Sequence, residues 1–356
     1  MNSMRERTQA FCNRFGLRLP ILLAPMAGAT APSLSIAVAN AGGLGSCGAL
    51  LMQPNEIAAW ANEVRANSNG AFQLNLWIPD PPPQRDTAQE ARMREFLGQW
   101  GPPVPPDAGD GTPPDFAAQC EALLQVGPPI VSSVMGLYPP DFVTRLKQRG
   151  IFWFAAVSTV AEARAAEAAG ADVIVAQGME AGGHRACFDA GLAEQQLVGL
   201  FSLLPAVVDA VKLPVVATGG IADARAAAAA FALGASAVQP GTAFLRCPEA
   251  KIHPAWAEAL ARTGPEDTRL TRAFSGRAGR SIATDYVRAT LAPDAPPPAP
   301  YPVQRGLTAP MRTQAQKSGD LQRMQVWAGQ SAAIGRTQPA AELIGSIWEG
   351  AQAILR

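Results

Sequence analysis

Short, continuously apolar segments recur through the first two thirds of the sequence, and most are separated by stretches with helical punctuation. Continuous rather than alternating apolarity is typical of parallel strands that are covered on both faces. The candidate strands are Ile21–Ala24, Leu44–Gly48, Phe72–Trp77, Pro129–Met135, Ile151–Val157, Asp172–Gln177, Pro214–Thr218 and Ala237–Gln239. A set of about eight such strands favours a closed (β/α)₈ TIM barrel over an open doubly wound sheet.

The segments between the candidate strands carry the start and stop residues of helices. Thr159 and Glu162 have the spacing of a capping box, and Gly170 can end the helix that follows. Asp223 can cap the next Ala-rich segment, which ends at Gly234. The alternation of strand and helix therefore agrees with a barrel built from βα units.

Two regions interrupt this pattern. Residues 79–129 are proline-rich and predict a long insertion that carries two short helices, and from about residue 247 the strand pattern stops. We therefore predict a barrel over residues 1–250. Residues 251–356 would form a smaller, mainly helical region that covers the barrel mouth, faces the substrate and packs back on the barrel.

Composition narrows the possible partners and location. The 29 basic residues balance the 29 acidic ones, so no global field favours nucleic acid or an anionic membrane. No apolar run reaches the roughly 18–20 residues of a membrane helix. The 5 cysteines are scattered, and no apolar segment of a secretory signal follows the first residues. A cytoplasmic location is expected, and no metal-ligand spacing is present.

Glycine turns follow the last two candidate strands, at the barrel rim where active sites lie. Gly219 and Gly220 precede the helix capped by Asp223, and Gly241 with Thr242 follows the next strand. Glycines let the backbone approach a phosphate, and the N–H groups of a helix start point toward it. The pattern predicts a phosphate site; the alternative is a pair of ordinary tight turns.

His184 is the strongest catalytic candidate, because it follows Gly182 and Gly183 in a loop directly after a strand. An imidazole there can take up or hold a proton near neutral pH; the alternative is a structural histidine. Asn75 and Gln177 end strands where their amides can bond the edge of a planar heterocycle, or can merely tie barrel backbone together.

Four further residues were weighed for a role. His253, before a proline and beyond the last strand, is predicted to be structural. Cys187 has no evident orienting partner, which disfavours a thiol nucleophile. Arg277 and Arg280 form a basic turn that either seals the phosphate end or is a solvated charge cluster.

At these positions the sequence resembles the nitronate monooxygenase family, formerly called 2-nitropropane dioxygenases. The resemblance runs in order across nearly the whole chain and is weakest in the proline-rich insertion. The segments that carry it are PILLAPMAG (20–28), QLNLW (73–77), QGMEAGGH (177–184), PVVATGGIAD (214–223), VQPGTAFL (238–245), FSGRAGR (274–280) and WAGQSA (327–332).

The resemblance implies an FMN-dependent TIM-barrel enzyme. An alkyl nitronate would reduce the flavin and O₂ would reoxidise it, giving a carbonyl compound and nitrite, with His184 as base or substrate-orienting group. Trp77, Met26 and Tyr301 would wall the substrate, and a homodimer is the assembly considered. The residues expected at FMN are Ala24, Pro25, Met26, Asn75, Gln177, Gly182, Gly219, Gly220, Gln239, Gly241 and Thr242.

The sequence departs from the family pattern after the histidine, where Arg185 stands in place of a further glycine, and in residues 281–285, which lack an expected asparagine. Three alternatives stay open. One is an FMN-dependent NAD(P)H reductase of the enoyl-ACP or quinone type, although no separate G-x-G-x-x-G unit is present. The others are a non-catalytic flavin- or phosphate-binding barrel and a phosphosugar enzyme without flavin.

Overall fold

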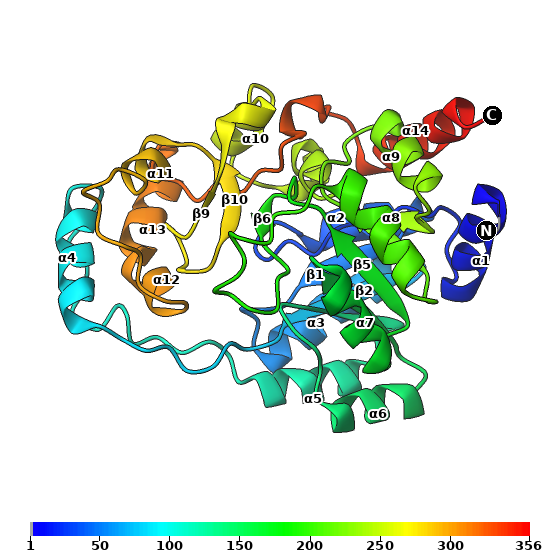
Figure 1. The fold of residues 1–356 in the computed structure, drawn as a ribbon, viewed down its shortest axis with the longest axis horizontal. Helices are drawn as coiled ribbons and strands as arrows, with labels where there is room; N and C mark the ends of the chain where they lie inside the picture. Colours follow the sequence, from blue (N-terminus) through cyan, green and yellow to red (C-terminus); the bar gives the residue numbers. More distant parts are fainter. Residues whose placement is uncertain (1–2) are drawn as a thin grey trace.

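The computed structural model describes residues 3–356, and its centre is a cylinder of parallel strands (Figure 1). The strands run, in the order of their pairing, β1 (Gly45–Gly48), β2 (Phe72–Trp77), β3 (Ile130–Val134), β4 (Phe152–Val157), β5 (Val173–Gln177), β7 (Val215–Thr218) and β8 (Ala237–Val238). Ile21 and Leu22 close the ring through parallel bridges to Val238 of β8 and Leu44 beside β1. The predicted TIM-barrel fold is therefore confirmed.

Helices surround the cylinder, and their predicted caps are present. Thr159 and Glu162 form the capping box of α7, and the Asp223 side chain accepts from the N–H groups of Arg225 and Ala226 in α9. The helices around the barrel are α2 (Pro32–Asn40), α3 (Pro54–Asn67), α5 (Phe116–Val126), α6 (Pro140–Gln148), α7 (Val160–Ala168), α8 (Leu200–Ala210), α9 (Ala224–Ala232) and α14 (Ala340–Ile354).

Side chains alternate between the outside and the inside of the cylinder, as strand geometry requires. On β4, Trp153 faces the layer between strands and helices, whereas Phe154 packs in the interior. On β5, Val173 and Val175 share that interior, and Gln177 reaches the opposite rim. The interior is thus apolar at its amino end and polar at its carboxyl end.

Helix α1 (Met4–Phe15) closes the amino end of the cylinder. Phe15 lies 5.0 Å from Phe152 and 4.9 Å from Phe154 between ring centroids, and both pairs meet edge to face. Phe11 packs in the same cluster. Because aromatic residues fill this end, the opposite end is left as the open mouth.

The insertion and the C-terminal region form a second cluster beside the barrel mouth. In Figure 1, α4 (Thr87–Gly98), in cyan, lies next to the orange helices α11 (Asp285–Ala289), α12 (Val303–Leu307) and α13 (Ala309–Ser318). Met93, Leu97, Tyr286 and Leu307 are buried together at their contact. Other elements are α10 (Pro254–Leu260), η1 (Thr242–Arg246), η2 (Pro248–Ala250), η3 (Pro265–Asp267) and η4 (Ala332–Ile334).

The expectation that strands end near residue 247 was wrong. β10 (Gly279–Ile282) pairs in antiparallel fashion with β9 (Thr268–Thr271) on one side and with the two-residue strand β6 (Gly183–His184) on the other. These strands are short and partly polar, so they lack the apolar run by which the barrel strands were recognised. The domain boundary at residue 250 remains a prediction.

All 5 cysteines are buried with free thiols. Among residues 3–356, no helix is both long and apolar enough to cross a membrane.

We expect Phe15→Ala to lower the free energy of unfolding by about 3 kcal/mol, because truncating a packed aromatic residue leaves a cavity. Urea unfolding of the variant measures this. Phe201→Ala is the matched control, because Phe201 is 74% exposed and its loss opens no cavity. Equal unfolding midpoints for the two variants would show that α1 does not seal the barrel.

Candidate active site

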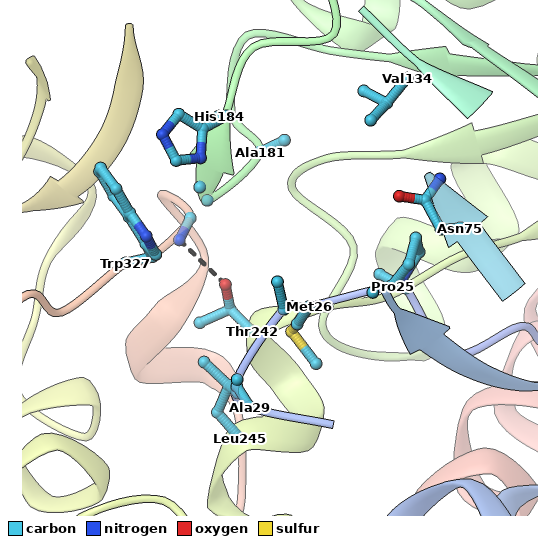
Figure 2. Close-up of a pocket in the computed structure, with 18 of the residues that line it drawn as sticks. Pro25, Met26, Ala29, Asn75, Val134, Ala181, His184, Thr242, Leu245 and Trp327 are labelled. Atoms are coloured by element: carbon cyan, nitrogen blue, oxygen red, sulfur yellow. Dashed lines mark hydrogen bonds between the residues drawn. The ribbon is translucent and has the colours of Figure 1, made fainter. Parts of the chain in front are cut away.

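A cavity of about 620 Å³ opens at the carboxyl ends of the barrel strands. All of the residues predicted to contact FMN or substrate line it, together with His184. Figure 2 shows Pro25, Met26, Asn75, His184 and Thr242 arranged around this space. The structure therefore brings segments from the whole length of the chain to one site.

The turn after β7 is shaped for an anion. Gly219 and Gly220 adopt φ values of +104° and +71°, a left-handed conformation that residues with a Cβ rarely accept. A Cβ on Gly219 would also lie 3.1 Å from the Gly178 carbonyl oxygen. The capped start of α9 follows directly, so backbone N–H groups and a helix N-terminus share this end of the cavity.

The C-terminal segment 327–332 fastens the glycine turns in place. Ser331 Oγ donates to the Gly220 carbonyl at 2.8 Å, and the Gly329 N–H donates to Thr242 Oγ1 at 3.0 Å. A Cβ on Gly182 would lie 2.5 Å from the Gly329 nitrogen. Gly182 is thus required by this close packing, besides any contact with a ligand.

Amide side chains lie at the polar end of the barrel: Asn75 and Gln239 line the cavity, and Gln73 is fully buried beside Gln239. Gln73 Nε2 lies 3.3 Å from Gln239 Oε1, and Asn75 Nδ2 donates to Ser132 Oγ at 3.0 Å. Gln73 Oε1 is buried and has no hydrogen-bond partner. An unpartnered buried acceptor is costly unless a ligand supplies a donor.

Gln177 holds the loop that carries His184. Its Nε2 donates to the His184 carbonyl at 3.1 Å, and its Oε1 accepts from the Ala186 N–H at 2.9 Å. Of the two roles considered for the Gln177 amide, the structure shows the one in which it bonds backbone groups of the barrel. Gln177 also lines the cavity.

The 24–26 segment passes over the end of β1 at very short range. A Cβ on Gly48 would lie 2.6 Å from the Ala27 nitrogen, so only glycine fits there. Gly241 faces the same segment, and its Cβ would be 3.3 Å from the Ala24 Cβ. The backbone of Ala24–Met26 therefore forms a floor of the cavity.

His184 lies on β6, and its side chain is fixed by Ser275. The ring Nε2 is 2.7 Å from Ser275 Oγ, while Nδ1 bonds no residue of the described range 3–356 and lies on the side of the ring toward the open space (Figure 2). Burial lowers the pKa of His184 from near 6.5 to about 3, and the charges of Arg277 and Arg305 act in the same direction. The imidazole is therefore neutral at physiological pH.

Aromatic rings enclose the imidazole on two sides. Trp77 and Trp327 have ring centroids 4.6 and 4.7 Å from that of His184, both at steep angles. Tyr301 lies 5.6 Å from Trp77, and its hydroxyl is buried without a hydrogen-bond partner. Tyr301 is thus a polar wall of the cavity rather than the apolar one expected.

Arg277 and Arg280 of the basic turn have structural roles, and neither side chain lines the cavity. Arg277 is 2% exposed, pairs with Asp80 and donates to the Cys187 carbonyl at 2.7 Å. Arg280 donates to the Met179 carbonyl and to Thr268 Oγ1, each at 3.0 Å. The interpretation as a solvated cluster was wrong, because both guanidinium groups are buried.

Other reactive side chains also have structural roles. Glu180 accepts from the Leu200 N–H and so caps α8. His253 Nδ1 accepts from Ala255 in α10, which confirms the structural role predicted for it. Burial raises the pKa of the Cys187 thiol, which disfavours the nucleophilic thiolate. No cluster of three metal-binding side chains occurs in residues 3–356.

Four of the cavity residues described above were not identified as site residues from the sequence. Ser275, Trp327 and Ser331 lie in segments 274–280 and 327–332, which carry the family resemblance, but they follow no barrel strand. Arg305 lies outside those segments, on the short helix α12, so nothing local indicated it. All four line the cavity.

We expect His184→Gln to make the fold more resistant to mild acid. The unfolded chain takes up a proton on His184 as the pH falls below 6.5, but the folded chain does so only near pH 3, so stability is lost over that interval. At pH 5 this loss is about 2 kcal/mol. Glutamine can still bond Ser275 but does not titrate.

Thermal unfolding at pH 7 and pH 5 measures the difference between the two proteins. Ionisation of all other groups cancels in the comparison. If the wild-type chain and His184→Gln lose the same stability between these pH values, the imidazole is not held neutral by its surroundings.

Comparison with known proteins agrees with the site. The nitronate monooxygenase family profile matches residues 10–350. A nitronate monooxygenase of Paraburkholderia phytofirmans is 38% identical over 338 residues, covering 93% of this chain and 92% of that protein. One from Pseudomonas aeruginosa is also 38% identical, over 96% of this chain and 99% of its own.

Solved structures show the same similarity. A nitroalkane oxidase from Streptomyces ansochromogenes superposes with a TM-score of 0.87 at 35% identity, covering 98% of this chain and all 100% of the other. FabK from Thermotoga maritima superposes with a TM-score of 0.75 at 28% identity, covering 97% and 96%. The family match spans residues 10–350, nearly the whole chain, and this chain therefore belongs to the nitronate monooxygenase family.

Proposed function

We propose that this protein binds FMN across the barrel mouth and oxidises alkyl nitronates with O₂, with His184 orienting the substrate. Membership of the family makes the chain an oxidoreductase that acts on nitronates. The observation that supports the finer proposal is a single cavity with a left-handed glycine turn and, on its wall, a neutral imidazole between two indoles.

The residues present fit FMN at both of its polar ends. The turn at Gly219 and Gly220, with the start of α9, would take the phosphate, and Thr242 adds a hydroxyl. The amides of Asn75 and Gln239, which both line the cavity, are suited to the ring's polar edge. When bound, FMN supplies the two-electron redox chemistry between nitronate and O₂.

His184 fits the role of a hydrogen-bond donor better than that of a base. A nitronate has already lost the proton on its reacting carbon, so no strong base is needed. Where the Ser275 hydroxyl donates to Nε2, at 2.7 Å, and not to the Arg277 carbonyl, at 3.2 Å, the neutral imidazole carries its hydrogen on Nδ1, toward the cavity. That N–H can bond a nitronate oxygen and set the carbon's position.

The aromatic walls complete the site by limiting water. Trp77 and Trp327 both contact the His184 ring at steep angles, so the two indoles cover part of the imidazole. Electrostatic and hydrogen-bond contacts gain strength where water is excluded. The same walls limit substrates to small or narrow groups near the imidazole.

We expect Gly219→Val to raise the dissociation constant for FMN about tenfold or more. Gly219 has φ +104°, and a Cβ there would lie 3.1 Å from the Gly178 carbonyl oxygen, so valine would distort the turn that is to take the phosphate. Fluorescence titration of the apoprotein with FMN measures this. Gly127→Ala is the control: Gly127 has φ +58° at the end of α5 with open space around it, so it carries backbone strain alone. Unchanged FMN affinity in Gly219→Val would refute this placement of the phosphate.

We expect His184→Asn to retain much of kcat/KM for propyl-2-nitronate, and His184→Leu to lose about 10²-fold. Asparagine can place an N–H near the position of Nδ1, whereas leucine has no donor. Oxygen consumption with preformed nitronate measures both. An equal loss in the two variants would indicate proton transfer by His184 instead of hydrogen bonding.

Anaerobic mixing separates the proposal from an NAD(P)H reductase. Propyl-2-nitronate alone should bleach the flavin absorbance of the purified protein, and NADPH alone should not. Bleaching by NADPH and none by nitronate would favour the reductase. A preparation that binds no FMN would leave the phosphosugar interpretation.

A further inference from the structure

One wall of the cavity carries a cation with no counter-ion. Arg305, on α12, lines the cavity and is half-buried, yet its guanidinium makes no hydrogen bond or ion pair with any described residue. Burial lowers its pKa, so the charged form is disfavoured by loss of water. Among residues 3–356, the cavity lining contains no Asp or Glu.

A second unsatisfied donor stands beside this guanidinium. The Tyr301 hydroxyl is buried without a partner, and its pKa is raised by burial, so it stays a neutral donor. Tyr301 and Arg305 interact electrostatically, and the charge of Arg305 also reaches His184. The three groups therefore act on one region of the cavity.

The other cations of the cavity do not share this property. All three donor nitrogens of Arg312 are occupied, by Thr308 Oγ1, Gln325 Oε1 and the Arg305 carbonyl. Lys317 is exposed at the rim, where water can solvate it. Among these three side chains, only Arg305 is half-buried and has guanidinium donors that bond no described residue.

We propose that Arg305, assisted by the Tyr301 hydroxyl, is the specificity-determining residue that binds the planar oxyanion of the substrate. A guanidinium offers two parallel N–H groups, which match the two oxygens of a nitronate as they match a carboxylate. His184 would add one further hydrogen bond. The site would thus select the nitronate anion over the neutral nitroalkane, which gives the guanidinium no charge to pair with.

This inference rests on the proposed function, but its test does not require turnover. Nitrate serves as a planar, non-reducing oxyanion, and its binding to the purified protein is measured by isothermal titration calorimetry. We expect Arg305→Gln to weaken nitrate binding about 10- to 100-fold, as expected for loss of charged hydrogen bonds. Arg305→Lys should restore part of the affinity, and Tyr301→Phe should weaken it several-fold.

Arg288→Gln is the matched control, because Arg288 is 60% exposed on α11, outside the cavity lining. It should bind nitrate like the wild-type chain. With nitronate as substrate, Arg305→Gln should raise KM more than it lowers kcat, because an anchor acts in the ground state and the transition state alike.

Two results would overturn the proposal. Nitrate binding unchanged in Arg305→Gln would show that the oxyanion lies elsewhere. Weaker FMN binding with unchanged nitrate affinity would assign Arg305 to the cofactor. If nitrate binds through Arg305 but nitronate is not oxidised, the anion site stands and the proposed function fails.

Discussion

The two-residue alternation of strands in a closed cylinder is the constraint on which the site depends. Because every second side chain points inward, the carboxyl ends of the strands deliver residues to the same small space. Asn75 and Trp77 arrive there from β2, and Gln177 from β5. The amino end is filled by Phe15 and its neighbours, so ligand can enter only from the opposite end.

The site also requires that backbone segments pack very close to one another. This close packing, more than the need for tight turns, explains why glycine stands at positions 48 and 182. The chain after Ala24–Met26 passes so close to Gly48 that a Cβ on Gly48 would clash with it. Segment 327–332 passes equally close to Gly182, where a Cβ would also clash. Segment 327–332 in turn fastens Gly220 through Ser331. The anion turn and the histidine loop are thus held by one C-terminal segment, so changes there would affect both ends of the cavity together.

The sequence predicted the barrel well, because its strands are apolar on both faces and its helices carry caps such as Asp223. It also identified the cavity residues that lie at strand ends, His184 included. It did not predict β9 or β10, whose short, partly polar segments form strands by pairing with each other and, for β10, with β6. Trp327 was likewise missed, because its place beside His184 depends on long-range packing.

The cavity contains a neutral hydrogen-bonding group, His184, and a charged group, Arg305, and the two have different roles toward a substrate. Burial keeps His184 neutral, so it can donate a hydrogen bond but cannot neutralise an anion. A substrate that enters as an anion needs a positive charge to offset its loss of water. Arg305 is the half-buried cation of the lining with free donors, and it has no carboxylate to compete for it. Orientation by a neutral ring and attraction by a guanidinium are thus separate properties, and each can be removed without the other.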